Sequence, residues 1–133
     1  MSEPLFLTGE EVLAYHAQQL ALFGGQAGVG DEGLLESALA QPQNLWLYNP
    51  QADLFDIAAA YAFHLAKNHP FNDGNKRTAL HAALAFLEVN QASITASQDE
   101  LYDAMIRLTT SELDKNGFAV FLRTHRRVSR QIP

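Results

Sequence analysis

The sequence predicts an all-α protein that folds as one helical bundle over residues 1–133, and three observations support this prediction. Residues 57–66 and 78–87 are apolar around nearly their whole circumference, which is typical of helices buried at the centre of a domain. Side chains that often cap helices precede other apolar segments. No window alternates strictly between apolar and polar residues, so nothing beyond an incidental strand is expected.

The first predicted helix covers residues 9–23. Thr8 and Glu11 have the spacing of a capping box, in which each side chain bonds the backbone of the other residue. Gly24 and Gly25 then supply a stop, and they open a glycine-rich loop that extends to residue 30.

A shorter helix is expected after this loop. Asp31 can cap it, and it should end at Pro42, because proline disfavours a helical conformation in the residue before it. Residues 42–52 are polar and aromatic, and they predict an irregular segment with some mobility. Within this segment, Trp46 and Tyr48 fit burial and the docking of a protein substrate equally well.

Two further helices are expected after the buried pair. Ser97 and Glu100 repeat the capping-box spacing and predict a helix over 98–108. Asp114 can open a last helix. The apolar face of that helix carries Phe118, Phe121 and Leu122. No internal repeat or domain boundary interrupts the pattern, so we expect a single domain.

Composition limits the possible functions. At 133 residues, with 47% hydrophobic and 18% charged residues, the chain can bury a core of its own. A net charge of −6 disfavours a general nucleic-acid binder, and the absence of cysteine excludes disulfides and thiolate metal sites. No segment resembles a membrane span or an export signal. We therefore expect a soluble, cytoplasmic protein without a membrane or specific nucleic-acid partner.

Basic residues gather near the C-terminus. Four of the nine lysines and arginines are Arg123, Arg126, Arg127 and Arg130. A partner or RNA patch is one explanation. We favour the simpler one, in which cations at a solvated helix end complement the helix dipole.

The densest group of reactive side chains lies between the two buried helices, at residues 67–77 (KNHPFNDGNKR). Pro70 and Gly74 interrupt the helical backbone, so this loop leads into a helix N-terminus. Such an end offers free amides and the positive end of the helix dipole, and both bind anions. The side chains of Lys76 and Arg77 add two positive charges, so the pattern predicts a polyanion site.

Asp73 and His69 complete the predicted chemistry. A carboxylate beside phosphates needs an intervening cation, and Mg²⁺ typically binds one or two carboxylates together with phosphate oxygens. His69 lies four residues before Asp73, and its imidazole can accept a proton from an attacking hydroxyl. A base, a metal ligand, free amides and cations together predict phosphoryl or nucleotidyl transfer.

The same residues also have an ordinary structural explanation. A histidine before proline is usually a surface loop residue, Asn-Asp-Gly-Asn is good turn chemistry, and a Lys-Arg pair is usually solvated. From the residues alone, the two interpretations are about equally supported. Helix capping and exposure likewise explain Asp31, Glu32 and Glu36, which are otherwise candidates for substrate contacts.

The other histidines predict no metal site. His16, His81 and His125 are isolated, and His64 lies five residues from His69, a spacing at which helical side chains diverge. His81 is the one polar residue of its apolar helix, and we expect it to be a hydrogen-bonded core group.

Residues 69–77 resemble the signature of the Fic/Doc family: His-x-Phe-x-Asp/Glu-Gly-Asn, then Gly or Lys, then Arg. The segments GGQAGVGDEGLLESA (24–38) and FLEVN (86–90) are similar to those that flank the signature in the death-on-curing (Doc) branch. Lys76 stands where Fic adenylyltransferases carry glycine, and Leu80 where they usually carry a second arginine. The resemblance implies a Fic-type helical bundle with the signature loop at the N-terminus of a buried central helix.

The resemblance also implies a role for each signature residue. His69 would be the catalytic base, Asp73 the magnesium ligand, and Phe71 the anchor of the loop in the core. The implied phosphate-binding residues are Gly74, Asn75, Lys76 and Arg77, with Lys67 as a weaker candidate that otherwise only ends its helix. Lys76 would crowd the pocket for the inner phosphates. ATP would then bind in the reverse orientation, so that its γ-phosphoryl group is transferred.

The function implied is that of a toxin in a toxin-antitoxin system, a kinase that phosphorylates a hydroxyl on a translation factor of the elongation factor Tu class. AMP or other nucleotidyl transfer is the alternative, and a catalytically idle binding module is a third possibility. Many Fic enzymes carry an inhibitory helix with Ser or Thr four residues before a Glu that precedes Gly or Asn. In this sequence no glutamate has both Ser or Thr four residues before it and Gly or Asn directly after it. The resemblance therefore implies a separate antitoxin, whose disordered tail folds on binding.

Overall fold

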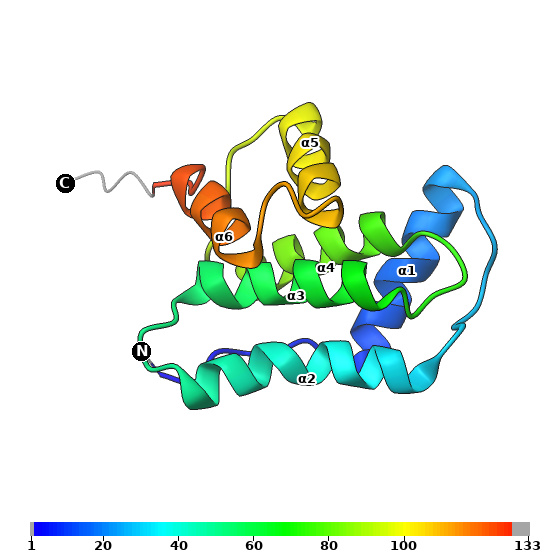
Figure 1. Cartoon of the computed structure of the whole chain (residues 1–133), viewed down its shortest axis with the longest axis horizontal. Helices are drawn as coiled ribbons and strands as arrows, with labels where there is room; N and C mark the ends of the chain where they lie inside the picture. The colour runs from blue at the N-terminus through cyan, green and yellow to red at the C-terminus, as the bar shows by residue number, and fades with distance from the viewer. Residues whose placement is uncertain (1, 129–133) are drawn as a thin grey trace.

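The computed structural model describes residues 2–128, which form six α-helices (Figure 1). In chain order these are α1 (Gly9–Phe23), α2 (Glu32–Tyr48), α3 (Leu54–Asn68), α4 (Asn75–Val89), α5 (Gln98–Thr109) and α6 (Lys115–Thr124). Within this range, extended pairing is limited to two isolated bridges, Val29 with Phe71 and Ile94 with Arg126. The all-α prediction is confirmed.

Helix α3 lies at the centre of the bundle. It contacts α2, α4, α5 and α6, and in Figure 1 it runs between α2 on one side and α5 and α6 on the other. Every residue from 57 to 62 is buried, so more than one full turn has neighbours all round. Its antiparallel partner α4 is buried over most of the predicted stretch 78–87, except at His81, Leu84 and Ala85, which are partly buried. Many residues of both helices are alanines, which permit close packing.

Side-chain caps fix five of the helix starts. Four predicted caps, Thr8, Asp31, Ser97 and Asp114, each accept a hydrogen bond from the backbone N–H three residues later. Asp53 caps α3 in the same way, which the sequence analysis did not identify. Arg123 of α6 donates to Asp53 at 2.9 and 3.0 Å and to Asp56 at 3.0 Å. This cluster ties α6 to the start of α3.

The prediction that the second helix ends at Pro42 is wrong, because α2 continues to Tyr48. A proline inside a helix removes one backbone hydrogen bond and costs about 3 kcal/mol. Here Pro42 is buried, and Leu45 and Trp46 pack against the core one turn later, so burial outweighs that cost. The irregular segment is therefore limited to residues 49–53. Tyr48 is 82% exposed and stays available for docking, whereas Trp46 is partly buried.

Three of the four C-terminal arginines lie within the described residues. Arg123 belongs to the last turn of α6 and is held by the carboxylates at the start of α3, whereas Arg126 and Arg127 are exposed. Arg130 lies outside the described residues. Of the six helices described, none combines the length and the apolar composition that crossing a membrane requires.

Candidate active site

The loop between α3 and α4 forms one wall of a pocket of about 550 Å³. The residue after α3, His69, has a left-handed backbone (φ 49°, ψ 54°), and so has Gly74 before α4 (φ 76°). That conformation costs a non-glycine residue of order 1–2 kcal/mol, so the surroundings must hold His69 in place. The lining residues are His69, Asn72, Asp73, Gly74, Asn75, Lys76 and Arg77, faced by Tyr102, Met105 and Ile106 of α5.

Helix α4 begins without a side-chain cap, unlike the other five described helices. Its N-cap residue is Gly74, and the first amide bonded within the helix is that of Thr78, which donates to the Gly74 carbonyl at 3.0 Å. The N–H groups of residues 75–77 precede that bond, so they are free to donate to a ligand. Together with the charges of Lys76 and Arg77 and the helix dipole, they make this end of the pocket suitable for phosphate.

The Asp73 carboxylate is exposed at the rim of the pocket. It accepts hydrogen bonds from the Gly74 amide at 2.9 Å and from the Gln26 amide at 3.2 Å. A Cβ on Gly25 would lie only 2.8 Å from Asp73 Oδ2, so the glycine-rich loop after α1 passes directly beside the carboxylate. Residues 2–128 contain no cluster of three or more metal-binding side chains. An Mg²⁺ ion at Asp73 would therefore take water and phosphate oxygens as its further ligands, as Mg²⁺ commonly does beside nucleotides.

Asn75 and Phe71 shape the loop from within. The Asn75 side chain accepts a hydrogen bond from the Phe71 amide and donates one to the Phe71 carbonyl, both at 3.0 Å. These two bonds tie the Asn75 side chain to the loop, and the Asn75 backbone amide stays a predicted phosphate ligand. Phe71 is 3% exposed and lies in the core, where an anchor of the loop would be expected.

The position of Lys67 does not fit the predicted phosphate contact. Its Nζ donates to the Thr109 carbonyl at 3.1 Å and to Ser111 Oγ at 2.9 Å, and it does not line the pocket. Carbonyls at a helix C-terminus lack helical partners, and a lysine commonly satisfies them. Lys67 thus ties α3 to the end of α5.

His16 is isolated in the sequence and was not predicted to belong to the site. The side chain is 5% exposed, its ring stacks on the Phe71 ring, and its Nε2 lies 2.7 Å from the Asp73 carbonyl oxygen. Val12 lies four residues earlier, on the same helical face, and is fully buried. That spacing was a signal that His16 points inward.

Comparison with known proteins identifies the family. A model of the Fic/DOC family matches residues 6–87, which is more than half of the chain and includes the whole signature loop. The chain belongs to the Fic/DOC family. It is 36% identical over 117 residues to "Protein kinase doc" of Escherichia phage P1, which covers 88% of this chain and 92% of that protein. It is 39% identical over 120 residues to "Toxin Doc" of Mycolicibacterium smegmatis, with coverage of 88% and 90%. Both relatives bear the name of the predicted Doc branch.

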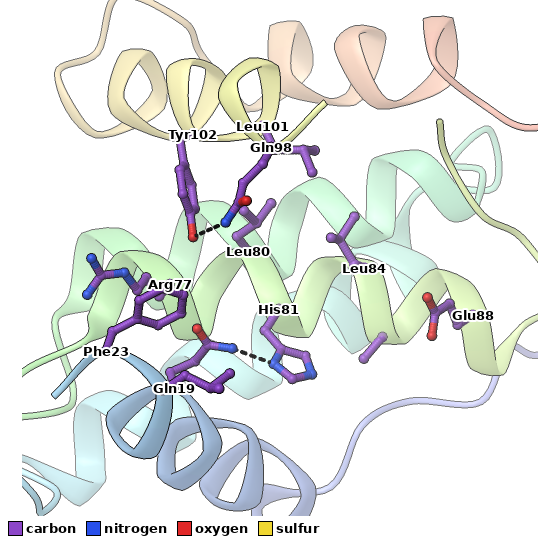
Figure 2. A pocket seen from close by; sticks show the side chains of 12 residues that line it. Gln19, Phe23, Arg77, Leu80, His81, Leu84, Glu88, Gln98, Leu101 and Tyr102 are labelled. Atoms are coloured by element: carbon purple, nitrogen blue, oxygen red, sulfur yellow. Dashed lines mark hydrogen bonds between the residues drawn. The ribbon is translucent and has the colours of Figure 1, made fainter. Parts of the chain in front are cut away.

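This Fic/DOC protein has a second hollow of about 370 Å³ between α1, α4 and α5 (Figure 2). Its apolar lining comes from Leu22, Phe23, Leu80, Leu84 and Leu101, and it shares Arg77 and Tyr102 with the first pocket. The Arg77 guanidinium lies 4.3 Å from the centre of the Phe23 ring, a favourable cation–π contact. Arg77 therefore stands at the boundary between the two hollows.

His81 opens onto this second hollow and is only partly buried. Its Nδ1 accepts a hydrogen bond from Gln19 Nε2 at 2.9 Å, as Figure 2 shows, and its ring stacks on Tyr15 with 4.4 Å between centres. Burial lowers the pKa of His81, although Glu88 partly opposes this effect. The hydrogen bond expected for a core group is present, but the residue itself borders a surface hollow of the Fic/DOC fold.

The other histidines of this Fic/DOC protein lie outside the first pocket. Burial, with a smaller effect of the neighbouring Lys115, lowers the pKa of His64 to about 4. His125 contacts the Phe121 carbonyl and the Glu100 carboxylate at the end of α6. Among residues 2–128, His69 is therefore the imidazole that lines the proposed phosphate site.

Proposed function

We propose that this Fic/DOC protein is a toxin that transfers the γ-phosphoryl group of ATP to a hydroxyl of a translation factor in the cytoplasm. One observation carries the proposal: the uncapped start of α4 presents free amides, Lys76 and Arg77 in the same pocket as His69. The names of the relatives, "Protein kinase doc" and "Toxin Doc", support both the reaction type and the biological role.

The arrangement suits an in-line displacement at phosphorus. His69 would accept the proton of the acceptor hydroxyl while the hydroxyl oxygen bonds to the γ-phosphorus. The bond from that phosphorus to the bridging oxygen breaks, and ADP leaves. The amides at the start of α4, with Lys76 and Arg77, would hold the negative phosphate oxygens. Asp73 would hold an Mg²⁺ ion, which when bound neutralises charge between the carboxylate and the phosphates.

Lys76 favours transfer of the terminal group over transfer of the nucleotidyl group. It is the second residue of α4 and lines the pocket beside the free amides. A lysine here fills space that a glycine would leave open for inner phosphates, and its charge favours the more anionic end of ATP. The nucleotidyl alternative requires the α-phosphate to occupy this crowded end.

Separately labelled ATP tests the proposal. Purified elongation factor Tu, as the candidate acceptor, is incubated with the protein, Mg²⁺ and ATP labelled at either the α or the γ position. We expect the γ label on the acceptor and no α label. Transfer of the α label without the γ label would establish the nucleotidyl alternative, and no transfer of either label would contradict both.

We also propose that an antitoxin silences the protein by docking an apolar segment in the second hollow. Leu22 and Phe23 on its rim are 72% and 45% exposed, so a docked segment would bury them. Arg77 at the shared boundary would let that segment disturb phosphate binding. An antitoxin tail that is disordered when free would become ordered as its apolar side chains enter this hollow. Calorimetric titration with the product of the adjacent gene tests this proposal; absence of binding would refute it for that protein.

A further inference from the structure

We propose that His16 is a positioning residue, which fixes the peptide unit between Asp73 and Gly74 so that its N–H group faces the phosphate pocket. His16 lies on α1, 57 residues before Asp73, and takes no part in the transfer described above. The effect on turnover rests on the proposed function, whereas the hydrogen bond that positions the peptide can be tested without it.

The imidazole of His16 touches the signature loop from its buried side. Its ring is nearly parallel to that of Phe71, with 3.9 Å between centres and 9° between planes. Its Nε2 is 2.7 Å from the carbonyl oxygen of Asp73, and because a carbonyl can only accept, Nε2 must carry the hydrogen. A Cβ built on Gly74 would lie 3.7 Å from the same nitrogen, so the ring also borders Gly74.

This hydrogen bond determines where the next amide points. In a trans peptide the C=O and N–H bonds point in opposite directions. With the Asp73 carbonyl turned toward His16, the Gly74 N–H points away from it, and it bonds the Asp73 carboxylate that lines the pocket. A flipped peptide would instead turn a carbonyl oxygen toward the phosphates, where it would repel them.

Gly74 makes such an outside restraint necessary. Glycine adopts positive and negative φ almost equally well, so its own backbone resists a peptide flip weakly. The φ of 76° at Gly74 is therefore fixed by neighbouring groups, and His16 donates the hydrogen bond that holds this carbonyl. The site needs an aromatic ring to stack on Phe71 and a donor at its edge, and histidine supplies both.

Two substitutions separate these properties. His16→Phe keeps a ring on Phe71 and removes the donor, whereas His16→Gln places an amide donor near the position of Nε2 and removes the ring. We expect His16→Phe to weaken Mg·ATP binding about tenfold, the effect of one hydrogen bond, and to lower kcat because the γ-phosphate is less well oriented. His16→Gln should restore most of the affinity even where it is the less stable protein.

The matched control is His125→Phe. His125 also contacts a main-chain carbonyl, that of Phe121, and packs against a phenylalanine ring, but it lies at the end of α6. The His125→Phe variant should bind Mg·ATP and turn over as the wild type does. Thermal melts of all variants show whether each one is folded. Unchanged affinity and kcat in a folded His16→Phe variant would overturn the proposal.

A measurement on the wild type covers the case in which His16→Phe does not fold. Long-range ¹H–¹⁵N spectra of the histidine rings at pH 8 report which nitrogen of His16 carries hydrogen. We expect it on Nε2; a bare Nε2 would overturn the proposal. If the wild type binds no Mg·ATP, the proposed function fails, yet the ring spectrum still decides whether His16 holds the loop.

Discussion

Gly25 offers a precise way to disturb Asp73 without touching it chemically. The residue has φ 123°, and a Cβ placed on it would lie 2.8 Å from Asp73 Oδ2 and 3.1 Å from Asp73 Cγ. In Gly25→Ala something must therefore shift, and the carboxylate, at the end of a flexible side chain, moves most easily. The neighbouring glycine provides the control, because Gly24 also has a positive φ, 77°, but a Cβ there would meet nothing within 4 Å.

The size of the effect follows from these distances. Ordinary contact begins at 3.4 Å, so the Asp73 oxygen must shift by roughly 0.6 Å, unless the Gly25 backbone shifts instead. A catalytic group must be held within about 0.5 Å of its productive position, and an error of 1 Å can cost about 100-fold. We therefore expect about a tenfold loss of transfer activity at limiting Mg²⁺ in Gly25→Ala. Both alanine variants should lose about 1–2 kcal/mol of stability, because both place a side chain at positive φ.

Initial rates of γ-label transfer, measured over a range of Mg²⁺ concentrations, provide the assay. In Gly25→Ala the apparent Mg²⁺ requirement should rise and the activity should partly recover at high Mg²⁺, whereas Gly24→Ala should follow the wild-type curve. Urea unfolding of both variants separates catalytic from global effects. Equal Mg²⁺ curves for the two variants would refute the assignment of Asp73 as the magnesium ligand.

Four further substitutions address other parts of the molecule. His69→Asn should reduce transfer at least about 100-fold with little change in the thermal midpoint, since asparagine tolerates the left-handed backbone but cannot act as the base. Lys76→Gly should lower γ transfer and raise α transfer, as double labelling would reveal. Arg123→Gln should cost about 1 kcal/mol in urea unfolding at pH 7, a value limited by solvent screening. Burial raises the pKa of Asp53, but its hydrogen bonds to Arg123 and Asp56, together with the charge of Arg123, outweigh burial and lower that pKa. The stabilisation is thus complete above the unfolded value of 3.8 and is lost as pH falls through the lower folded pKa, so the variant and the wild type should converge in stability below that pKa. Leu84→Asp should abolish protection by the antitoxin in a growth assay, and retained protection would exclude the second hollow as its docking site.

Features set by neighbouring residues in the chain were predictable from the sequence. The capping boxes at Thr8 and Ser97 need only a spacing of three residues, and the buried helices α3 and α4 need only a continuous apolar surface. The loop before α4 was recognisable because Pro70 and Gly74 interrupt the helix whatever surrounds them.

Features set by residues distant in the chain were not predictable in this way. The local effect of Pro42 is to end a helix, but packing of the following turn against the core keeps α2 intact. Lys67 was grouped with the phosphate site by its place in the sequence, yet its partners belong to the end of α5, more than forty residues later. His16 was missed for the same reason, since its partner Asp73 is 57 residues away.

Backbone ¹H–¹⁵N spectra of the full chain, recorded with ATP before and after Mg²⁺ is added, test the central claim most directly. We expect the largest shifts at the amides of Asn75, Lys76 and Arg77, and we expect them only with Mg²⁺, because the Asp73 carboxylate otherwise repels the phosphates. No shift at these three amides on saturation with Mg·ATP, or shifts confined to the second hollow, would contradict the assignment of the start of α4 as the phosphate site.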